Sequence, residues 1–382
     1  MLWPFSPQAG TVIETLEWTT FVERTRSGEQ RMSPRPIPRQ GFELTHRMDP
    51  QTYGRARELA LRAMSSELDI PVWPEHSSVG NVNQGQVTFP IDATGKCYHS
   101  GRKLVLWQDA LNHEELTIYS IGSGTIQTTT GSSRAYASAL AAPARIATFR
   151  QDFLAARTHP TLIEATAHFD VTRTEDLASQ EGGLFYPLYR GDEVVTSSRF
   201  VTGDTGDKVI QNVDELDPGT GAVWKRAMYT SETQESSVGW YPLTAADLWS
   251  TRIWLHTRRG RLRQFWTSSW NADLTVTADI ADDATTVEIE DIDFGVTYST
   301  PVDFGILTTD GTVYGFRVSS VTAGGAGKEI LHLAETLPAI PVASIVGVSR
   351  LTLSRFKSDR IELVHRYGRA ARIVVPVVEV QQ

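Results

Sequence analysis

The sequence predicts a mainly β fold with two helices, in which an outer β unit with its helix occurs twice in tandem. Each copy is interrupted by a small inserted β-barrel or sandwich. Three observations lead to this prediction. Most of the 382 residues read as short apolar and β-branched runs between Gly, Pro, Asp and Asn. Only two segments have helical spacing. The same order of features follows each of those segments.

The first helix is predicted over about residues 50–66. Four residues spaced three and four apart would form its buried face, namely Tyr53, Ala56, Ala60 and Ala63. The second helix is predicted to begin at Thr244, with Asp247 completing a capping box, and to end at Gly260. Its apolar residues leave little polar surface, so we expect it to be largely buried: Leu248, Trp249, Ile253, Trp254 and Leu255.

The two stretches that follow the helices share one order of features. Each has an aromatic exit, a first strand, a Tyr and Ser pair, a hydrophobic strand, a turn and a strand of matching pattern. The exits are Trp73 in one stretch and Phe265 with Trp266 in the other, and the Tyr and Ser pairs are Tyr98 with Ser100 and Tyr298 with Ser299. The register between the halves is left open, because the alignment rests on pattern alone.

Domain boundaries follow from this repeat. We predict a first outer unit over residues 1–84 with 150–180, interrupted by a small β domain over 85–149. A second outer unit is predicted over 181–274 with 351–382, interrupted by a small β domain over 275–350. The chain leaves each outer unit and returns to it through a strand-like segment.

Composition excludes several classes of protein. Lys and Arg number 36 against 45 Asp and Glu, and the resulting charge of -9 opposes nonspecific binding to nucleic acid or an anionic membrane. The opening MLWPFSPQ lacks the features of a signal peptide, and no run approaches the roughly 18 apolar residues of a membrane span. We therefore expect a soluble protein made in the cytoplasm. Cys97 is the only cysteine, so no intrachain disulfide can form.

Motifs that would carry chemistry are weak, and we predict no enzyme, no metal and no cofactor. The sequence His113-Glu114-Glu115 lacks the second His of a zinc protease helix. The segment VTAGGAGKE lacks the first Gly and the Ser/Thr of a P-loop, so it predicts a Gly-rich hairpin turn. The segment IGSGT at 121–125 lacks the spacing of a nucleophile elbow, so Ser123 is predicted to be a turn residue.

Two charged stretches have an ordinary structural interpretation beside a functional one. The acidic residues of 279–293 suit calcium, but an alternating strand with Val287, Ile289 and Ile292 inward is favoured. A basic run follows the second helix, and its members are Arg258, Arg259, Arg261 and Arg263. It suits phosphate contacts, but cations at a helix C-terminus that pack on neighbouring aromatic side chains are favoured.

Aromatic residues are abundant, and the chain has ten Trp. Clusters of this kind form cores and subunit contacts more often than sugar sites. We predict that four of them are structural core residues: Trp73, Trp249, Trp254 and Trp266. In the alternative interpretation, Trp107 or its neighbours stack on a sugar.

Taken in order, several segments resemble the baseplate proteins of long-tailed bacteriophages, most closely the distal tail proteins. They are WPFSPQ, LEWTTFVERTRSGEQRMSPRPIPRQGFEL, IPVW after the first helix, DPGTGAVW, RRGRLRQFW, and LSRFKSDRIELVHRYGRAARIVVPVVEV. The resemblance implies a virion structural protein of the tail tip, made in the host bacterial cytoplasm, that links the tail tube to the baseplate hub. Short distal tail proteins carry one ring-forming domain, whereas this chain has two similar halves.

The implied partners are copies of the chain itself, the tail tube protein, and the baseplate hub and tape-measure proteins. A six-fold ring is expected, or three chains that present six similar units. We predict that an arm over residues 24–40 crosses to a neighbour through its arginines: Arg24, Arg26, Arg31, Arg35 and Arg39. The alternative function is a carbohydrate-binding adhesin of a phage tail.

Overall fold

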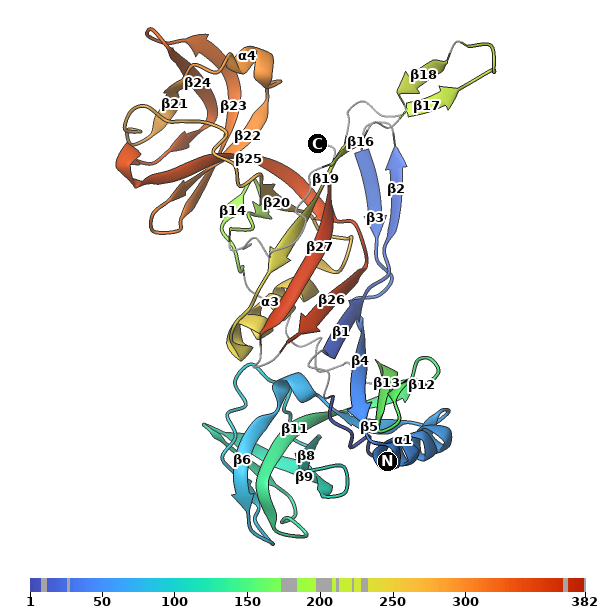
Figure 1. The fold of residues 1–382 in the computed structure, drawn as a ribbon. Coiled ribbons are helices and arrows are strands. Elements are labelled where there is room, and N and C mark those ends of the chain that lie inside the picture. Colours follow the sequence, from blue (N-terminus) through green and yellow to red (C-terminus); the bar gives the residue numbers. More distant parts are fainter. Residues whose placement is uncertain are drawn as a thin grey trace.

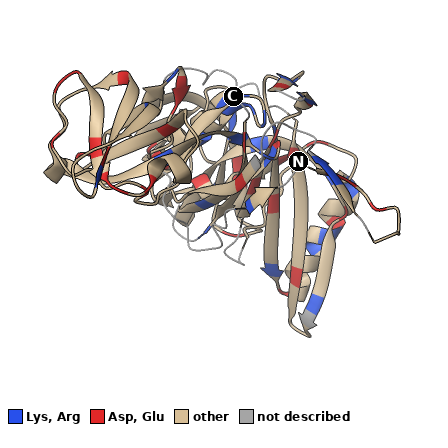
Figure 2. Cartoon of the chain, turned by 90° about the horizontal axis from the view of Figure 1, so that it is seen from above, with Lys and Arg blue, Asp and Glu red and all other residues tan. Residues whose placement is uncertain are grey.

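The structure is a computed structural model that describes residues 1–7, 12–25, 28–172, 184–196, 208–210, 213–221, 223–227, 233–366 and 370–380. It is mainly β, with 53% strand and 11% helix, and this confirms the β-rich part of the predicted fold class. Figure 1 shows central strands between a lower lobe, which contains β6, β8, β9 and β11, and an upper lobe, which contains β21 to β25. Acidic and basic residues are interspersed along the chain (Figure 2).

The central strands form one antiparallel run of eight. The order is β12 (Leu154–His159), β13 (Leu162–Val171), β4 (Arg39–Met48), β1 (Val12–Glu17), β26 (Arg360–His365), β27 (Ala371–Glu379), β19 (Thr233–Trp240) and β16 (Lys208–Ile210). The first four strands come from the first half of the chain and the last four from the second. The pair between β1 and β26 therefore joins the two halves.

Three hairpins accompany these strands. The pair β2 (Phe21–Thr25) and β3 (Gly28–Met32) lies between β1 and β4 in the sequence. The pair β17 (Val213–Leu216) and β18 (Trp224–Ala227) lies between β16 and β19. The short pair β14 (Leu188–Tyr189) and β15 (Asp192–Glu193) precedes β16 in the sequence.

Helix α1 (Pro50–Ala63) confirms the first predicted helix. Asp49 caps it by accepting hydrogen bonds from the backbone of Gln51 and Thr52, and Pro50 occupies its first turn, where a backbone donor is not needed. Its buried residues are Ala56, Ala60 and Ala63, and Tyr53 packs against the same core. The face predicted from the spacing is therefore the face that the helix buries.

Helix α3 (Ala245–Arg258) confirms the second. The Thr244 side chain accepts from the Asp247 backbone and the Asp247 side chain accepts from the Thr244 backbone, which is the predicted capping box. Arg259 adopts a left-handed conformation at the C-terminus, and Gly260 follows with a positive φ. A third helix, the single turn α4 (Phe294–Thr297), was not predicted.

The lower lobe follows β5 (Leu68–Pro71) and the short 3-10 helix η1 (Trp73–Glu75). Its strands are β6 (Ser77–Val82), β7 (Thr88–Phe89), β8 (Lys103–Trp107), β9 (His113–Gly122), β10 (Thr125–Thr128) and β11 (Tyr136–Phe149). β11 pairs with β6 and β8, β9 pairs with β8 and β10, and β10 pairs with β7. The segment IGSGT forms the predicted turn between β9 and β10, with Gly124 at positive φ.

The upper lobe follows β20 (Phe265–Ser268). Its strands are β21 (Ala284–Glu290), β22 (Val302–Thr308), β23 (Val313–Ala323), β24 (Lys328–Leu337) and β25 (Ile345–Phe356), and the 3-10 helix η2 (Val342–Ser344) precedes β25. The pairs run β21 to β24, β24 to β23, β23 to β22 and β22 to β25. Single bridges from Leu274 to Val348 and from Val276 to Ile289 complete a closed circuit of pairings.

Separate hydrophobic clusters lie in the lobes and in each half of the central strands. One contains Trp3, Phe42 and the alanines of α1, and another contains Trp18, Trp254 and Phe356. The upper lobe has its own core around Phe304, and the lower lobe has one around Leu104. Val287 and Ile289 are buried as the alternating pattern predicts. Within the described residues, no helix has the length and apolar character that would let it cross a membrane.

Candidate functional site

A buried cluster of charged groups lies where the two halves of the chain meet. Strand β1 lies between β4 and β26, and the side chain of Glu14 on β1 is fully buried. Its Oε1 accepts a hydrogen bond from Gln40 Nε2 at 2.7 Å, and its Oε2 lies 2.7 Å from Arg252 Nη2 and 3.0 Å from His365 Nε2. Glu14 and Gln40 belong to the first half, and Arg252 and His365 to the second.

Arg252 connects Glu14 to a second buried carboxylate. Its Nη1 lies 3.1 Å from Oε1 of Glu75 on η1, and its guanidinium lies over the Trp249 ring. Oε2 of Glu75 accepts hydrogen bonds from the Cys97 backbone at 2.6 Å and from Cys97 Sγ at 2.7 Å. Helix α3 of the second half is thus fixed by charge to both β1 and η1 of the first.

In this cluster, burial and ion pairing shift the pKa values of the charged groups in opposite directions. For Glu14 and Arg252, the combined effect of the ion pairs is the larger. Burial alone would raise the pKa of Glu14, but Arg252 and His365 hold that pKa well below its usual range. Burial would also lower the pKa of Arg252, but Glu14 and Glu75 raise it above its usual value. Burial raises the pKa of the Cys97 thiol well above its normal range, and Glu75 adds to the effect.

The cluster therefore serves as a polar connection between the halves. The Glu14, Glu75 and Arg252 side chains are between 0% and 4% exposed, so a substrate cannot reach them while the halves are joined. A protonated, buried thiol is also a poor nucleophile. Sequence reasoning missed these residues, and the available signal was the presence of charged residues inside otherwise apolar elements, as with Glu14 in VIETLE and Arg252 in α3.

The arginines predicted as an interface lie on or beside the hairpin β2–β3. Arg31 donates to the carbonyl of Leu262 at 2.9 Å and to Oε1 of Gln264 at 2.6 Å, and it also lies 3.3 Å from Glu29. Glu29 in turn accepts two hydrogen bonds from Arg355, at 2.6 and 3.0 Å. The hairpin of the first half is therefore anchored on the second half of the same chain.

The other members of that set have separate positions. Arg24 lies 3.5 Å from Glu29 and remains exposed, and Arg35 donates to the Glu17 carbonyl at 3.3 Å. Arg39 is exposed at the start of β4, opposite Glu17 of β1. Arg26 lies outside the described residues. A role for these arginines in contacts between copies stays a prediction.

The four Trp residues predicted as structural differ in their burial. Trp73, Trp254 and Trp266 are buried, whereas Trp249 is only half-buried and packs from α3 onto the core of the first half. Trp254 lies in an aromatic cluster, and its Nε1 donates to Oε2 of Glu193 at 3.2 Å. Trp107, on which a sugar would stack in the alternative interpretation, packs edge-on against Trp73 and donates its Nε1 to the Pro4 carbonyl at 2.7 Å. Its ring therefore belongs to the first core.

The basic run at the C-terminal end of α3 makes its contacts within the chain. Arg258 lies 2.6 Å from Glu193 and over the Trp254 ring. Arg261 lies 3.1 Å from Asp359 of the segment between β25 and β26. These contacts agree with the structural interpretation of the run, in which arginine stems pack on aromatic side chains.

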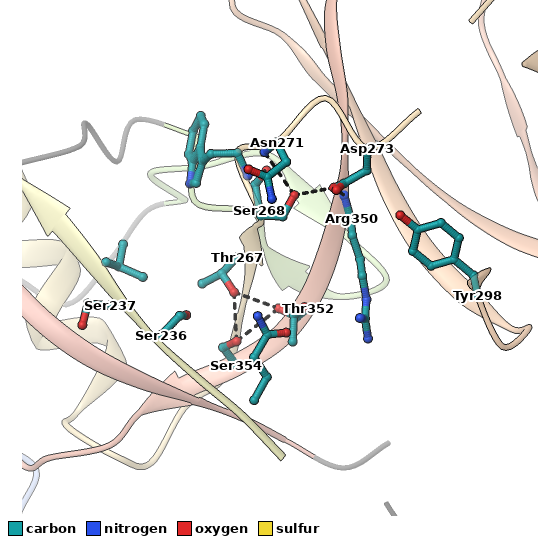
Figure 3. Close-up of a pocket in the computed structure, with 14 residues that line it drawn as sticks. Ser236, Ser237, Thr267, Ser268, Asn271, Asp273, Tyr298, Arg350, Thr352 and Ser354 are labelled. Carbon is teal, nitrogen blue, oxygen red and sulfur yellow. Dashed lines mark hydrogen bonds between the residues drawn. The ribbon is translucent and has the colours of Figure 1, made fainter. Parts of the chain in front are cut away.

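A polar pocket of about 230 Å³ lies between the central strands and the upper lobe (Figure 3). Its lining is rich in hydroxyl groups from β19, β20 and β25, and includes Ser236, Ser237, Thr267, Ser268, Thr352 and Ser354. The Thr267 and Ser354 hydroxyls lie 2.9 Å apart. Along the same pocket lie Arg350 and Tyr298, and burial raises the pKa of the Tyr298 hydroxyl, so that it stays a donor at neutral pH.

This pocket is suited to a small polar ligand that offers several hydroxyl groups. Oδ2 of Asp273 accepts a hydrogen bond from the Arg350 backbone at 2.7 Å, and this holds the carboxylate at the rim. Nε of Arg350 has no hydrogen-bond partner within the described part of the chain. No group of three or more His, Cys, Asp or Glu side chains that would hold a metal ion occurs among the residues described.

Comparisons with known proteins do not assign a family. No protein-family model matches the chain, and no curated protein shows significant sequence similarity to it.

Proposed function

We propose that this chain is a structural component of a bacteriophage tail tip, a distal tail or baseplate ring protein that links the tail tube to the baseplate hub. In this proposal it has no catalytic role, and it works through contacts with copies of itself and with the tail tube, hub and tape-measure proteins. Its place is the tail tip of the virion, after synthesis in the bacterial cytoplasm. The sequence resemblance provides the class of protein, and the arrangement of strands supports it.

The strand pairings support a tandem duplication. In the first half, β13 pairs with β4, β12 and β11, and β11 also pairs with β5. In the second half, β27 pairs with β19, β26 and β25, and β25 also pairs with β20. A helix follows β4 and another follows β19. The same four pairings and the same helix therefore occur in the same chain order.

The lobes support the inserted domains of this proposal. Each lobe begins after the strand that follows the helix, β5 or β20, and ends on a long strand that returns to the central run, β11 or β25. Each lobe has its own buried cluster. A small β-barrel inserted at the same place in both units accounts for these features.

The observation that carries the proposal is that two similar units lie in one continuous antiparallel run. Units of this kind that repeat their contacts from chain to chain form a closed ring when the rotation permits. Six chains, or three chains with six units, would surround the tail channel.

The proposal is tested by locating the chain on a virion. Native mass spectrometry of the purified protein should give a closed assembly of three or six chains, and electron microscopy of isolated tail tips should show it as a ring around the channel. A virion density in which the chain is absent from the tail, together with a purified chain that stays monomeric, would contradict the proposal.

A second candidate function is glycan binding by a phage tail adhesin, and the hydroxyl-rich pocket favours it. Arg350, Asp273 and the Tyr298 ring offer the polar and aromatic groups that sugars use. The test is isothermal titration of the chain with bacterial surface oligosaccharides. Arg350→Ala should abolish the heat of binding, and the exposed Arg57→Ala on α1 is the control. Equal heats from both variants would exclude this pocket.

A further inference from the structure

We infer that β16 of one copy pairs with the free edge at the start of β12, over residues 152–154, in a second copy of this chain, in the register that β1 and β26 show within the chain. The inference rests on the proposed function, because it assumes that the two halves are repeats, and it names the surface through which copies would join. Its starting point is that β1 and β26, from different halves, already form such a pair inside one chain.

The first step matches β12 to β26. In the first half, Phe149 of β11 faces Phe169 of β13, and in the second half Phe356 of β25 faces Val377 of β27. When the two phenylalanines Phe149 and Phe356 are taken as equivalent, Phe169 of β13 corresponds to Val377 of β27. From that match, Ala165 corresponds to Ile373. Ala165 faces Ala155 of β12, and Ile373 faces Leu363 of β26. Ala155 therefore corresponds to Leu363, and Leu154 to Glu362.

The second step matches β16 to β1 by the same method. Thr15 faces Gly41 of β4, and Gly41 faces Asp170 of β13. Lys208 faces Glu235 of β19, and Glu235 faces Val378 of β27. Asp170 faces Thr148, which precedes Phe149, and Val378 faces Arg355, which precedes Phe356. Asp170 and Val378 are therefore equivalent in the same match. Lys208 therefore corresponds to Thr15, and Val209 to Leu16.

Burial distinguishes the equivalent strands. Leu16 is 0% exposed and belongs to the core of the other half, whereas Val209 is 72% exposed. Ile361, which faces Leu16, is buried, but Phe153 at the corresponding place is only partly covered, and Leu154 beside it is 56% exposed. The apolar positions that the internal pair buries are therefore open at the two ends of the run.

The direction of the strands permits a second copy to continue the run. Among the described strands, β12 pairs only with β13, and β16 only with β19, so the two outer edges are free. The eight strands are antiparallel throughout, and β16 followed by β12 of the next copy keeps that alternation. An exposed edge of this kind is a template for an added strand. Because the two edges differ, the contact is head-to-tail and can close a ring.

The hairpins provide an independent sign of the same surface. The hairpin β2–β3 of the first unit is anchored on the second unit through Arg31 and Glu29. The hairpin β17–β18, at the equivalent place in the second unit, has Leu216 opposite Trp224, and Trp224 is 71% exposed. A neighbouring first unit would cover this apolar pair in the same way.

The test is a disulfide between copies. The transferred register places Lys208 opposite Leu154, as Thr15 is opposite Glu362. Facing residues of antiparallel strands lie about 4.5–5.5 Å apart at Cα, which suits a disulfide. The full chain with Lys208→Cys and Leu154→Cys is oxidised and run without reductant. The matched control combines Lys208→Cys with Ala156→Cys, two residues out of register on the same exposed strand.

The in-register chain should give a ladder of covalent oligomers that ends at the size of the ring, and the control pair should stay largely monomeric on the gel. Mixing the two single variants should give covalent dimers only, as head-to-tail contact requires. The native Cys97 is left unchanged in these variants, because it is buried and should not form disulfides in the folded chain. Val209→Asp should weaken self-association by at least about tenfold, since it would bury a charge, whereas the exposed Val296→Asp should not change it.

Two results would overturn the inference. Assemblies that form by light scattering, but link no better in register than out of register, would exclude this strand pair and leave the proposed ring intact. A chain that stays monomeric and unlinked at every concentration would exclude both. Should the cysteine pair fail to fold by circular dichroism, the Val209→Asp comparison decides the question alone.

Discussion

Replacing Arg252 with Met tests the charged connection between the two halves. The guanidinium lies 2.7 Å from Glu14 and 3.1 Å from Glu75, and all three side chains are at most 4% exposed. Methionine retains much of the volume but leaves two buried carboxylates without their cation. Removing one partner from a buried ion pair costs about 3–5 kcal/mol, so we expect the free energy of unfolding to fall by about that amount.

The measurement is urea unfolding at about pH 7, followed by tryptophan fluorescence. The matched control is Arg57→Met on α1, which removes an exposed ion pair with Glu58 and should cost at most about 1 kcal/mol. The triple variant that also carries Glu14→Gln and Glu75→Gln removes the charges together. It should recover part of the loss, because uncharged groups cost less to bury.

The pH dependence gives the sharper test. In the wild type the folded pKa of Glu14 lies below its unfolded value of about 4.3, so its contribution is complete above that pH and is lost on further acidification. Without Arg252 the main attraction that lowers this pKa is gone, and burial raises it. As the pH falls from about 7 to 4.5, protonation of Glu14 should therefore stabilise the folded variant, whereas the wild type gains nothing from this group, and the difference in stability between the two proteins should narrow. Two results would refute the reasoning: a difference in unfolding free energy between wild type and variant that does not change with pH, or a cost of the Arg252→Met substitution below about 1 kcal/mol at about pH 7.

Trp254→Ala should lower the free energy of unfolding by about 3–5 kcal/mol in urea, and an unchanged melting temperature with lost tail binding would make it an interface residue instead. Burial lowers the pKa of His46 to about 4, so the neutral ring adds stability that is lost as pH falls below about 6.5; His46→Gln should flatten that loss in urea titrations. Native Cys97 should resist a thiol reagent that labels it fully after unfolding. Fragments 77–150 and 274–350, which include β6 and the Leu274 bridge of the two lobes, should each melt cooperatively when expressed alone, and β-type spectra without a transition would contradict this.

Local signals in the sequence were enough to predict the two longer helices, α1 and α3. The spacing of Ala56, Ala60 and Ala63 reports one apolar face, and the pair Thr244 and Asp247 satisfies backbone donors that are only three residues apart. The turn residues were equally local, because Gly124 and the glycines of 324–327 act on their own backbone. Features of this kind do not depend on how distant segments meet.

The charged cluster depends on distant segments, and for that reason the sequence did not reveal it. Arg252 and Glu14 are 238 positions apart, and Glu14 and His365 are 351 apart. Arg252 lies in a helix, α3, that also has exposed residues, so the sequence of the helix does not show which of its residues are buried. Arg252 is buried because the first half of the chain packs against α3. The position of Trp249 depends on the same meeting of the halves, because it packs from α3 onto the core of the first half and is half-buried there.

In the proposed duplication, the register between the halves could not be read from the residues, because the positions that the strand pairings match carry different side chains. His46 corresponds to Trp240, and Arg355 to Thr148, when each strand is placed through the partner that it faces. What the two halves share is the network of backbone pairs, which any side chain of suitable size can support. Side chains at matching positions can differ because each half packs against different residues in its own core. At the junction of β1 and β26, Leu16 is held between two units, and Val209 keeps an apolar side chain at the matching exposed place. An apolar residue on an open strand edge favours aggregation unless a partner covers it, so its presence there argues for an edge that is covered in the assembled state.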